Sequence, residues 1–224
     1  MIRVSCGLIA GMVLALAAGA AEEQAHGLVF ERWLRETFFE GYNPKGYTQK
    51  WDIPAEANKD HGRIPVNPKV AKYGMPVGMG DALRQFDINE PFLLIVGFWD
   101  QETPETKRFV NAQAVRVEPE TWRKLWGDIT REDLDRMVAV VKDPALTIEE
   151  ARARVAAMKK TAPYNRTVIE LNPKLDRSQR RLQCSLGFAA FFDRLAPAAD
   201  RSRQEKPAVF GIPVPNRIES KPRK

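Results

Sequence analysis

An unbroken apolar run between residues 92 and 99 most constrains what this chain can fold into. Its sequence is FLLIVGFW, and no polar residue interrupts it. A strand with one solvated face alternates apolar and polar residues, whereas an uninterrupted run indicates a strand covered on both faces. We therefore predict that Phe92–Trp99 is a buried strand near the centre of the fold.

Other segments predict the elements around this strand. Apolar residues at helical spacing favour a helix over Leu28–Glu40. Further strands are expected over Tyr47–Ile53, Arg63–Val70 and Lys107–Val117; prolines within the second of these are typical of an edge or irregular strand. The remaining predicted elements are helices opening at Glu118, over Leu134–Val141, over Thr147–Lys160 and over Ser178–Leu195, and a late strand over Thr167–Leu171. The order predicts an α/β fold, a central mixed β-sheet flanked by helices.

Length and composition are consistent with one globular domain. The chain has 224 residues, of which 44% are hydrophobic and 29% charged, enough for one buried core. We expect the domain over residues 22–196 and a partly ordered, basic, proline-containing tail over residues 197–224. The formal net charge of +6 and the pI near 9.4 favour an anionic partner such as nucleic acid or a membrane surface. Ordinary surface lysines would give the same values.

The N-terminus has the pattern of an export signal. A positive start precedes an apolar run over Gly7–Ala18, and the small residues Ala18-Gly19-Ala20 follow. The run is too short to span a bilayer comfortably. We predict a cleaved signal peptide over residues 1–21 and a secreted or periplasmic protein; an uncleaved anchor is the alternative.

Cysteine and histidine usage excludes several classes of site. Loss of Cys6 with the signal would leave Cys184 alone, so no intramolecular disulfide and no cysteine-histidine zinc site is expected. The two histidines are His26, beside the processing site, and His61, in a polar segment. Serine-histidine and cysteine-histidine catalysis are therefore disfavoured.

An acid and a lysine on successive predicted strands are the best indication of chemistry. Asp52 lies at one strand end and Lys69 on the next strand, an arrangement that suits metal-dependent phosphodiester cleavage. The acid would bind Mg²⁺, and the lysine would hold the attacking water and stabilise transition-state charge. Glu31, in the first helix, could reach the same metal through a water. Each residue also has an ordinary interpretation, as a strand end, an edge charge or a polar helix face.

Because of the order of these elements, the region from Leu28 to Trp99 resembles the PD-(D/E)xK superfamily of restriction-endonuclease-like nucleases. The resemblance comprises a helix with an acid, a hairpin ending at Trp51-Asp52 and the strand segment Asn67-Pro68-Lys69. The segment Gly80–Phe86 and the apolar strand after it fit the core helix and strand of that fold. Part of the later chain, over residues 171–185, is also similar to the C-terminal part of some restriction-type enzymes.

The resemblance implies a restriction-endonuclease-like fold and Mg²⁺-dependent cleavage of double-stranded DNA. Asp52 and Glu31 would be the metal ligands and Lys69 a catalytic residue. Asn67 stands where the family has Asp or Glu, and an amide is a weaker cation ligand than a carboxylate. Either Glu31 or Asp81 compensates, or the metal site is weakened, or the protein keeps the fold without the activity.

Three basic residues near the C-terminus are candidates for DNA contact. Lys174, Arg180 and Arg181 could bind phosphates, which positions a duplex without reading its sequence; a plain basic surface is the alternative. We thus expect an exported, Mg²⁺-dependent DNA endonuclease. The alternatives are an inactive nuclease-fold protein that binds DNA or another polyanion, and an exported binding or structural protein. A homodimer also stays open.

Overall fold

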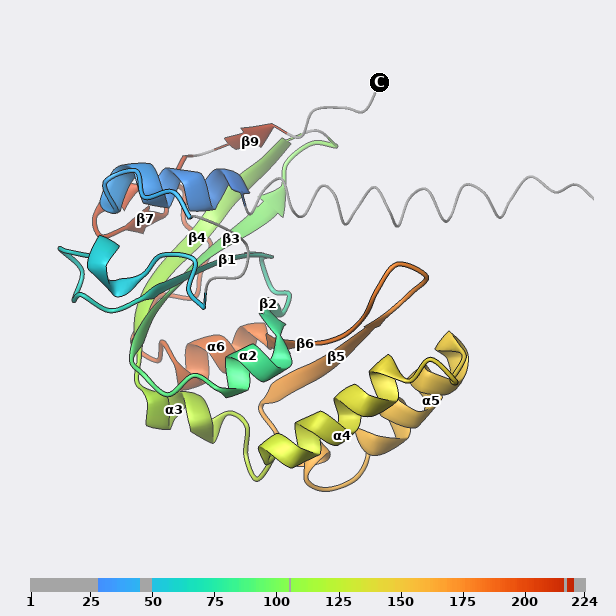
Figure 1. Ribbon diagram of the computed structural model, residues 1–224. Helices are drawn as coiled ribbons and strands as arrows, with labels where there is room; N and C mark the ends of the chain where they lie inside the picture. Colours follow the sequence, from blue (N-terminus) through green and yellow to red (C-terminus); the bar gives the residue numbers. More distant parts are fainter. Residues whose placement is uncertain (1–27, 45–49, 105, 216, 220–224) are drawn as a thin grey trace, which may run out of the picture.

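The computed structural model describes residues 28–44, 50–104, 106–215 and 217–219. The predicted signal peptide, residues 1–21, lies outside these ranges. Figure 1 shows two main sheets, with helices packed around both. Within the described ranges, no helix combines the length and the apolar composition that crossing a bilayer requires.

The larger sheet is built on the predicted buried strand. This strand, β3 (Phe92–Gln101), pairs in parallel with β1 (Val66–Lys72) and antiparallel with β4 (Thr106–Val117). A short strand, β9 (Arg217–Glu219), pairs with the far side of β4, so the order is β1-β3-β4-β9. All residues from 92 to 99 are buried. The sheet is mixed, as predicted, and β1 is an edge strand.

The two faces of β3 contribute to separate hydrophobic clusters. One cluster contains Phe92, Leu94, Val96 and Phe98 and extends to the second sheet. The other contains Leu93, Ile95 and Trp99 and includes the buried face of the first helix, described over residues 28–38. Side chains alternate across a strand, so a run that is apolar at every position fills both clusters.

Close packing of the first helix on the sheet depends on Gly97. A Cβ atom added at Gly97 would lie 2.8 Å from Cε1 of Phe109 and 3.0 Å from Cε2 and Cζ of Phe30. The rings of Phe30 and Phe109 pack with centroids 5.0 Å apart. The missing side chain at Gly97 therefore sets how near the helix, which carries Glu31, lies to the sheet.

The second sheet is antiparallel and lies beside two helices (Figure 1). Its order is β2 (Val77–Asp81), β6 (Arg180–Leu186) and β5 (Ile169–Leu175). Helices α4 (Arg131–Lys142) and α5 (Ile148–Met158) pack against β6 and β5 respectively. The shorter elements are η1 (Ala55–Ala57), α2 (Ala82–Phe86), α3 (Pro119–Lys124), η2 (Tyr164–Arg166) and α6 (Phe188–Arg194).

The predicted helix over Ser178–Leu195 is wrong in its first half. Residues 180–186 form β6, and only Phe188–Arg194 are helical. The reason is that Leu182, Cys184 and Leu186 alternate with polar residues, so the apolar residues share one buried strand face. Their antiparallel pairing with β5 makes this segment one arm of a hairpin.

Within the described part of the predicted strand over Tyr47–Ile53, only one residue takes part in β-pairing. Residues 47–49 lie outside the described residues, and residues 50–52 are not in a strand. Ile53 alone forms an isolated antiparallel bridge with Val66. Pro54, which follows directly, has no N–H with which to extend the pairing.

The segment predicted as a partly ordered tail packs against the domain over much of its described length. Asn111 Nδ2 donates to the backbone oxygens of Asp200 at 2.9 Å and Ser202 at 2.7 Å. Val209 and Val214 are buried in the cluster beside the first helix. The strands β7 (Ala208–Val209) and β8 (Ile212–Pro213) pair with each other. These residues therefore belong to the core as well as to the surface.

The close approach at Gly97 yields a stability prediction. Gly97→Ala should lower the free energy of unfolding by about 1–3 kcal/mol, because the added methyl group displaces two buried rings. Gly78→Ala is the control, since a Cβ there would meet nothing within 4 Å. Urea unfolding monitored by fluorescence measures both. Equal stability of Gly97→Ala and the wild type would contradict this view of the helix–sheet contact.

Candidate functional site

Asp52 is fixed by the residues on either side of it. The Nε1 atom of buried Trp51 donates to Glu90 Oε1 at 3.1 Å. On the other side, Ile53 and Val66 exchange two backbone hydrogen bonds, of 3.2 and 2.8 Å. The segment around Asp52 is thus anchored to both the edge strand and the start of β3, which leaves the carboxylate itself at a defined place beside β1.

Lys69 meets Asp52 directly. Lys69 Nζ donates to Asp52 Oδ2 at 3.2 Å and to the backbone oxygen of Pro68 at 2.8 Å. The lysine side chain is 18% exposed and the aspartate side chain 43%. A partly exposed pair of this kind contributes little to stability. The pair is relevant to chemistry rather than to stability, because a compact cation and a carboxylate lie in contact at a partly solvated position.

Glu31 lies within electrostatic range of this pair without a direct contact among the described interactions. Its Oε1 accepts a hydrogen bond of 2.8 Å from Arg35 Nη1, one helical turn away. Burial is the largest cause that raises the pKa of Glu31, and repulsion from Asp52 adds to it. Arg35 and Lys69 act in the opposite direction. The structure therefore brings Glu31 close to the predicted site as a carboxyl group that resists ionisation.

A cavity of about 300 Å³ is lined by three of the predicted catalytic residues, Asp52, Asn67 and Lys69. Its walls come from the segment before Ile53, from β1, β2 and α2. Asn67 and Lys69 are two positions apart and share one face of β1. Asn67 is only 4% exposed. The lining residues are Lys50, Asp52, Asn67, Lys69, Gly78, Met79, Gly80, Asp81, Arg84 and Gln85. Glu31 is not among them.

The far wall is shaped by a bulge at the end of β2. Gly80 has φ +93°, and the register with β6 shifts between Gly78 and Gly80. A side chain is strained in this left-handed conformation, so glycine suits the position. The bulge leads into Asp81, whose Oδ1 accepts from Arg84 N at 3.0 Å and caps α2.

Gln85 is a member of the cavity that sequence reasoning missed. It is 6% exposed, and its Oε1 is buried without a hydrogen-bond partner among the described residues. Ala82 and Gln85, three residues apart, are the buried positions of α2. No local sequence pattern marks Gln85, because tertiary packing alone buries it.

The cavity offers oxygen ligands of the kind that hard cations prefer. Asp52 and Asp81 supply carboxylates, and Asn67 and Gln85 supply amide oxygens. Mg²⁺ binds carboxylate, carbonyl and water oxygens and often uses only one or two protein carboxylates. No group of three or more His, Cys, Asp or Glu positioned for a metal occurs in the part of the chain that is described. The residues fit Mg²⁺ only if amides or waters complete the set.

Lys174 and Arg181 lie in a different environment from Arg180. Lys174 and Arg181 are exposed and directly opposite each other in the β5–β6 hairpin. Arg180 instead donates to the backbone oxygens of Asp143 and Leu146, between α4 and α5. The guanidinium of Arg180 thus ties the hairpin to the helices. The loop of this hairpin projects from the domain in Figure 1.

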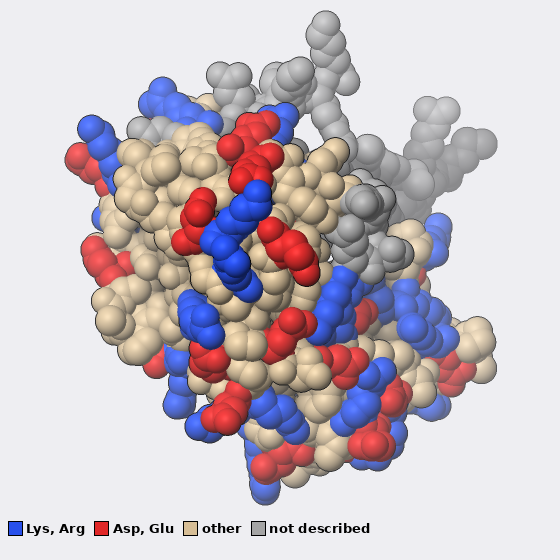
Figure 2. Space-filling model, turned by 60° about the vertical axis from the view of Figure 1, so that its left-hand side comes forward, with Lys and Arg blue, Asp and Glu red and all other residues tan. Residues whose placement is uncertain are grey.

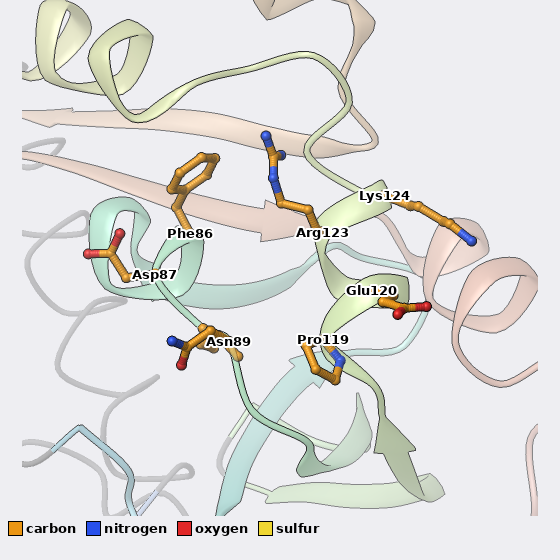
Figure 3. Close-up of a pocket in the computed structure, with 8 residues that line it drawn as sticks. Phe86, Asp87, Asn89, Pro119, Glu120, Arg123 and Lys124 are labelled. Atoms are coloured by element: carbon orange, nitrogen blue, oxygen red, sulfur yellow. The ribbon is translucent and has the colours of Figure 1, made fainter.

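One face of the molecule and a second cavity differ in chemistry from this site. Figure 2 shows basic and acidic side chains intermixed on one face, without a continuous basic field. A larger cavity, of about 630 Å³, lies between α2 and α3 (Figure 3). There Arg123 lies 4.8 Å from the ring centroid of Phe86 and donates to two backbone oxygens. Asp87 pairs with Arg131 at 2.6 Å. None of the predicted site residues lines this cavity.

No protein-family model, curated protein or solved structure matches the chain. The fold is mixed α/β, with a mixed sheet flanked by helices.

The environment of Glu31 yields a pH prediction. Because the fold raises the pKa of Glu31 above 4.5, its ionised form destabilises the folded state at neutral pH. Glu31→Gln should therefore be more stable than the wild type at pH ~7. This advantage should disappear as the pH falls below 4.5, where the carboxyl group is protonated in both states.

Unfolding by urea at several pH values measures the difference in free energy. Glu36→Gln, at an exposed position of the same helix, is the matched control for loss of one helix carboxylate. A wild type that is more stable than Glu31→Gln at neutral pH would show that the Arg35 contact outweighs burial and repulsion.

Proposed function

We propose that this protein is an exported, Mg²⁺-dependent endonuclease that hydrolyses phosphodiester bonds in double-stranded DNA. The observation that carries the proposal is the contact of Lys69 with Asp52, 3.2 Å from nitrogen to oxygen, in a cavity also lined by Asn67 and Asp81. Three basic and two acidic side chains line that cavity, which suits a metal ion together with an anionic phosphate.

Each residue has a defined task in this reaction. Bound Mg²⁺ would neutralise phosphate charge and lower the pKa of a coordinated water. Asp52 is the carboxylate that would hold the metal. Lys69 orients the attacking water and stabilises the negative charge that develops on the phosphate. Glu31, whose pKa is raised by burial and by Asp52, would act on this site through its charge or through a bridging water.

The order of the elements supports the same proposal. Asp52 precedes the bridge residue Ile53, and Lys69 lies on β1, which is parallel to β3. The connection from β1 to β3 contains α2, as the resemblance to the PD-(D/E)xK superfamily implies. These features support the nuclease interpretation through connectivity, which is independent of any single side chain.

The β5–β6 hairpin supports DNA as the partner. Lys174 and Arg181 are direct cross-strand partners, and neither forms an ion pair among the described residues. Like charges placed directly opposite in a sheet destabilise it. Phosphates of a duplex would relieve this repulsion, so we assign phosphate contact to Lys174 and Arg181 and a structural role to Arg180.

A second function is favoured by one observation. Asn67 is neutral, and Lys69 already occupies one oxygen of Asp52. A site with too weak a hold on Mg²⁺ would retain affinity for polyanions through its basic residues. The alternative is therefore a nuclease-fold protein that binds DNA or another polyanion without cutting it.

The first test removes the two central groups. Asp52→Asn and Lys69→Met should each lower the rate of Mg²⁺-dependent DNA cleavage by about 100-fold or more, since each removes a charge used in the transition state. Binding of the same DNA in Ca²⁺ should change much less. Asp87→Asn, at an aspartate outside the cavity, is the control.

Supercoiled plasmid and a labelled duplex, each with Mg²⁺ or EDTA, provide the rates. Cleavage that survives in both variants would remove Asp52 and Lys69 from the mechanism. DNA binding without cleavage in the wild type would favour the second function.

The second test concerns the hairpin. Lys174→Gln and Arg181→Gln should weaken duplex binding for all sequences alike and lower the salt dependence of binding by about 1 per removed charge. Lys124→Gln on α3 is the matched control. Fluorescence anisotropy at several salt concentrations gives the slopes, and unchanged slopes in both hairpin variants would place the duplex elsewhere.

A further inference from the structure

The β5–β6 hairpin has an apolar face and a polar face. Leu182 and Cys184 of β6 are buried on the face that packs against α4. Because side chains alternate across a strand, the residues between them point away from this core. The outward residues toward the loop, all partly or fully exposed, form the ribbon face: Asn172, Lys174, Arg181 and Gln183.

The ribbon face is continuous with the cavity of Asp52 and Lys69. Asp81, Gln183 and Asn172 are direct partners across β2, β6 and β5, so they form one row on the same face of the sheet. Asp81, at one end of this row, lines the cavity. Neighbouring strands lie about 4.8 Å apart, so the row spans roughly 10 Å. A DNA strand in the cavity would therefore pass the ribbon face within a few nucleotides, at about 3.4 Å per nucleotide.

Hydrogen bonds fix the shape of the hairpin from behind and at its loop. Arg152 of α5 donates to the backbone oxygen of Leu175 at 2.6 Å, and Arg180 binds the connection between α4 and α5. In the loop, Asp176 Oδ1 accepts from Gln179 N at 3.0 Å, and Asp176 N donates to Gln179 O at 3.1 Å. An element that is already ordered loses little conformational entropy when it binds a partner.

The ribbon face combines unpaired cations with available amide groups. Lys174 and Arg181 form no ion pair among the described residues, and the Gln183 amide makes no hydrogen bond there. Asn172 Nδ2 donates to Ser185 Oγ at 2.8 Å, which orients this amide beside Gln183. Cations bind phosphates without reading sequence, whereas glutamine and asparagine amides match the donors and acceptors of base edges. The two kinds of group together suit a duplex better than they suit an isolated anion.

We propose that the ribbon face enters the major groove of duplex DNA, where Gln183 contacts the edge of an adenine and Lys174 and Arg181 hold the flanking phosphates. The major groove is about 12 Å wide and admits a two-stranded β-ribbon. A glutamine amide pairs with both N6 and N7 of adenine. The loop of the hairpin projects from the domain (Figure 1), as an element inserted into a groove must. The proposal deepens the function proposed above and rests on its DNA partner, to which it adds a sequence preference.

The test measures sequence preference by binding in EDTA, where metal-dependent cleavage does not occur. The purified protein selects duplexes from a library with randomised positions, and the bound pool is sequenced. The wild type should enrich adenine at one position. Gln183→Ala should lose this preference while keeping the wild-type salt dependence of binding, because an amide carries no charge. Gln101→Ala, at an exposed strand glutamine of the other sheet, should keep the preference.

Two further measurements keep the test decisive if Gln183→Ala loses its fold. Gln183→Glu should change the preferred base from adenine to cytosine, because a carboxylate accepts a hydrogen bond from the cytosine amino group. With the wild type, 7-deazaadenine at the enriched position should weaken binding about tenfold, because this base lacks the N7 acceptor of the major groove.

The outcomes separate this proposal from the proposed cleavage. No enriched base in the wild type, or the same preference in the wild type and Gln183→Glu, would overturn major-groove reading. Full binding to the 7-deazaadenine duplex would overturn it as well. Cleavage of plasmid DNA by the wild type would leave the nuclease proposal standing in each of these cases. A preference that Gln183→Glu alters, in a protein that cuts no DNA, would retain the ribbon face and reject the nuclease.

Discussion

Burial of β3 on both faces is the constraint on which the rest of the structure depends. Alternate side chains of Phe92–Gln101 enter two different hydrophobic clusters, so layers must cover both sides of the sheet. The first helix covers one side, and the second sheet with its helices lies on the other. The parallel partner β1 is then an edge strand, and the cavity forms where this edge meets β2 and α2.

The sequence predicted the elements whose periodicity is unambiguous. The apolar run at Phe92 and the helical patterns over Leu134–Val141 and Thr147–Lys160 predicted β3, α4 and α5. The segment before Leu186 was harder, because Leu182, Cys184 and Leu186 suit a strand while nearby residues suit a helix. Pairing with β5 decided between them, and this long-range contact is not visible in a local pattern.

Most of the candidate site could also be expected from the sequence. Asp52 and Lys69 are in contact, Asn67 lines the same cavity, and Glu31 interacts electrostatically with the pair. Gln85 could not be singled out, because a glutamine in a short helix is usually solvated and only tertiary packing buries it. The packing of the segment after residue 197, predicted as a partly ordered tail, is not visible in a local pattern either, since it depends on contacts such as those of Asn111.

Three features on separate elements lower the stability of the fold. Burial and Asp52 disfavour the ionised form of Glu31, Gln85 has an unpaired oxygen, and Lys174 faces Arg181 across a hairpin. Features of this kind concentrate at functional sites, where a ligand rather than the fold satisfies them.

The central claim is that Asp52 and Lys69 act as one unit on a phosphodiester. A double-mutant cycle in single-turnover cleavage of a duplex tests it most directly, using Asp52→Asn, Lys69→Met and the double variant. Residues that act as a unit are strongly non-additive, so the double variant should be about as slow as the slower single variant. Losses that multiply would show that the two residues act independently. A wild type with no cleavage in Mg²⁺ would contradict the claim outright.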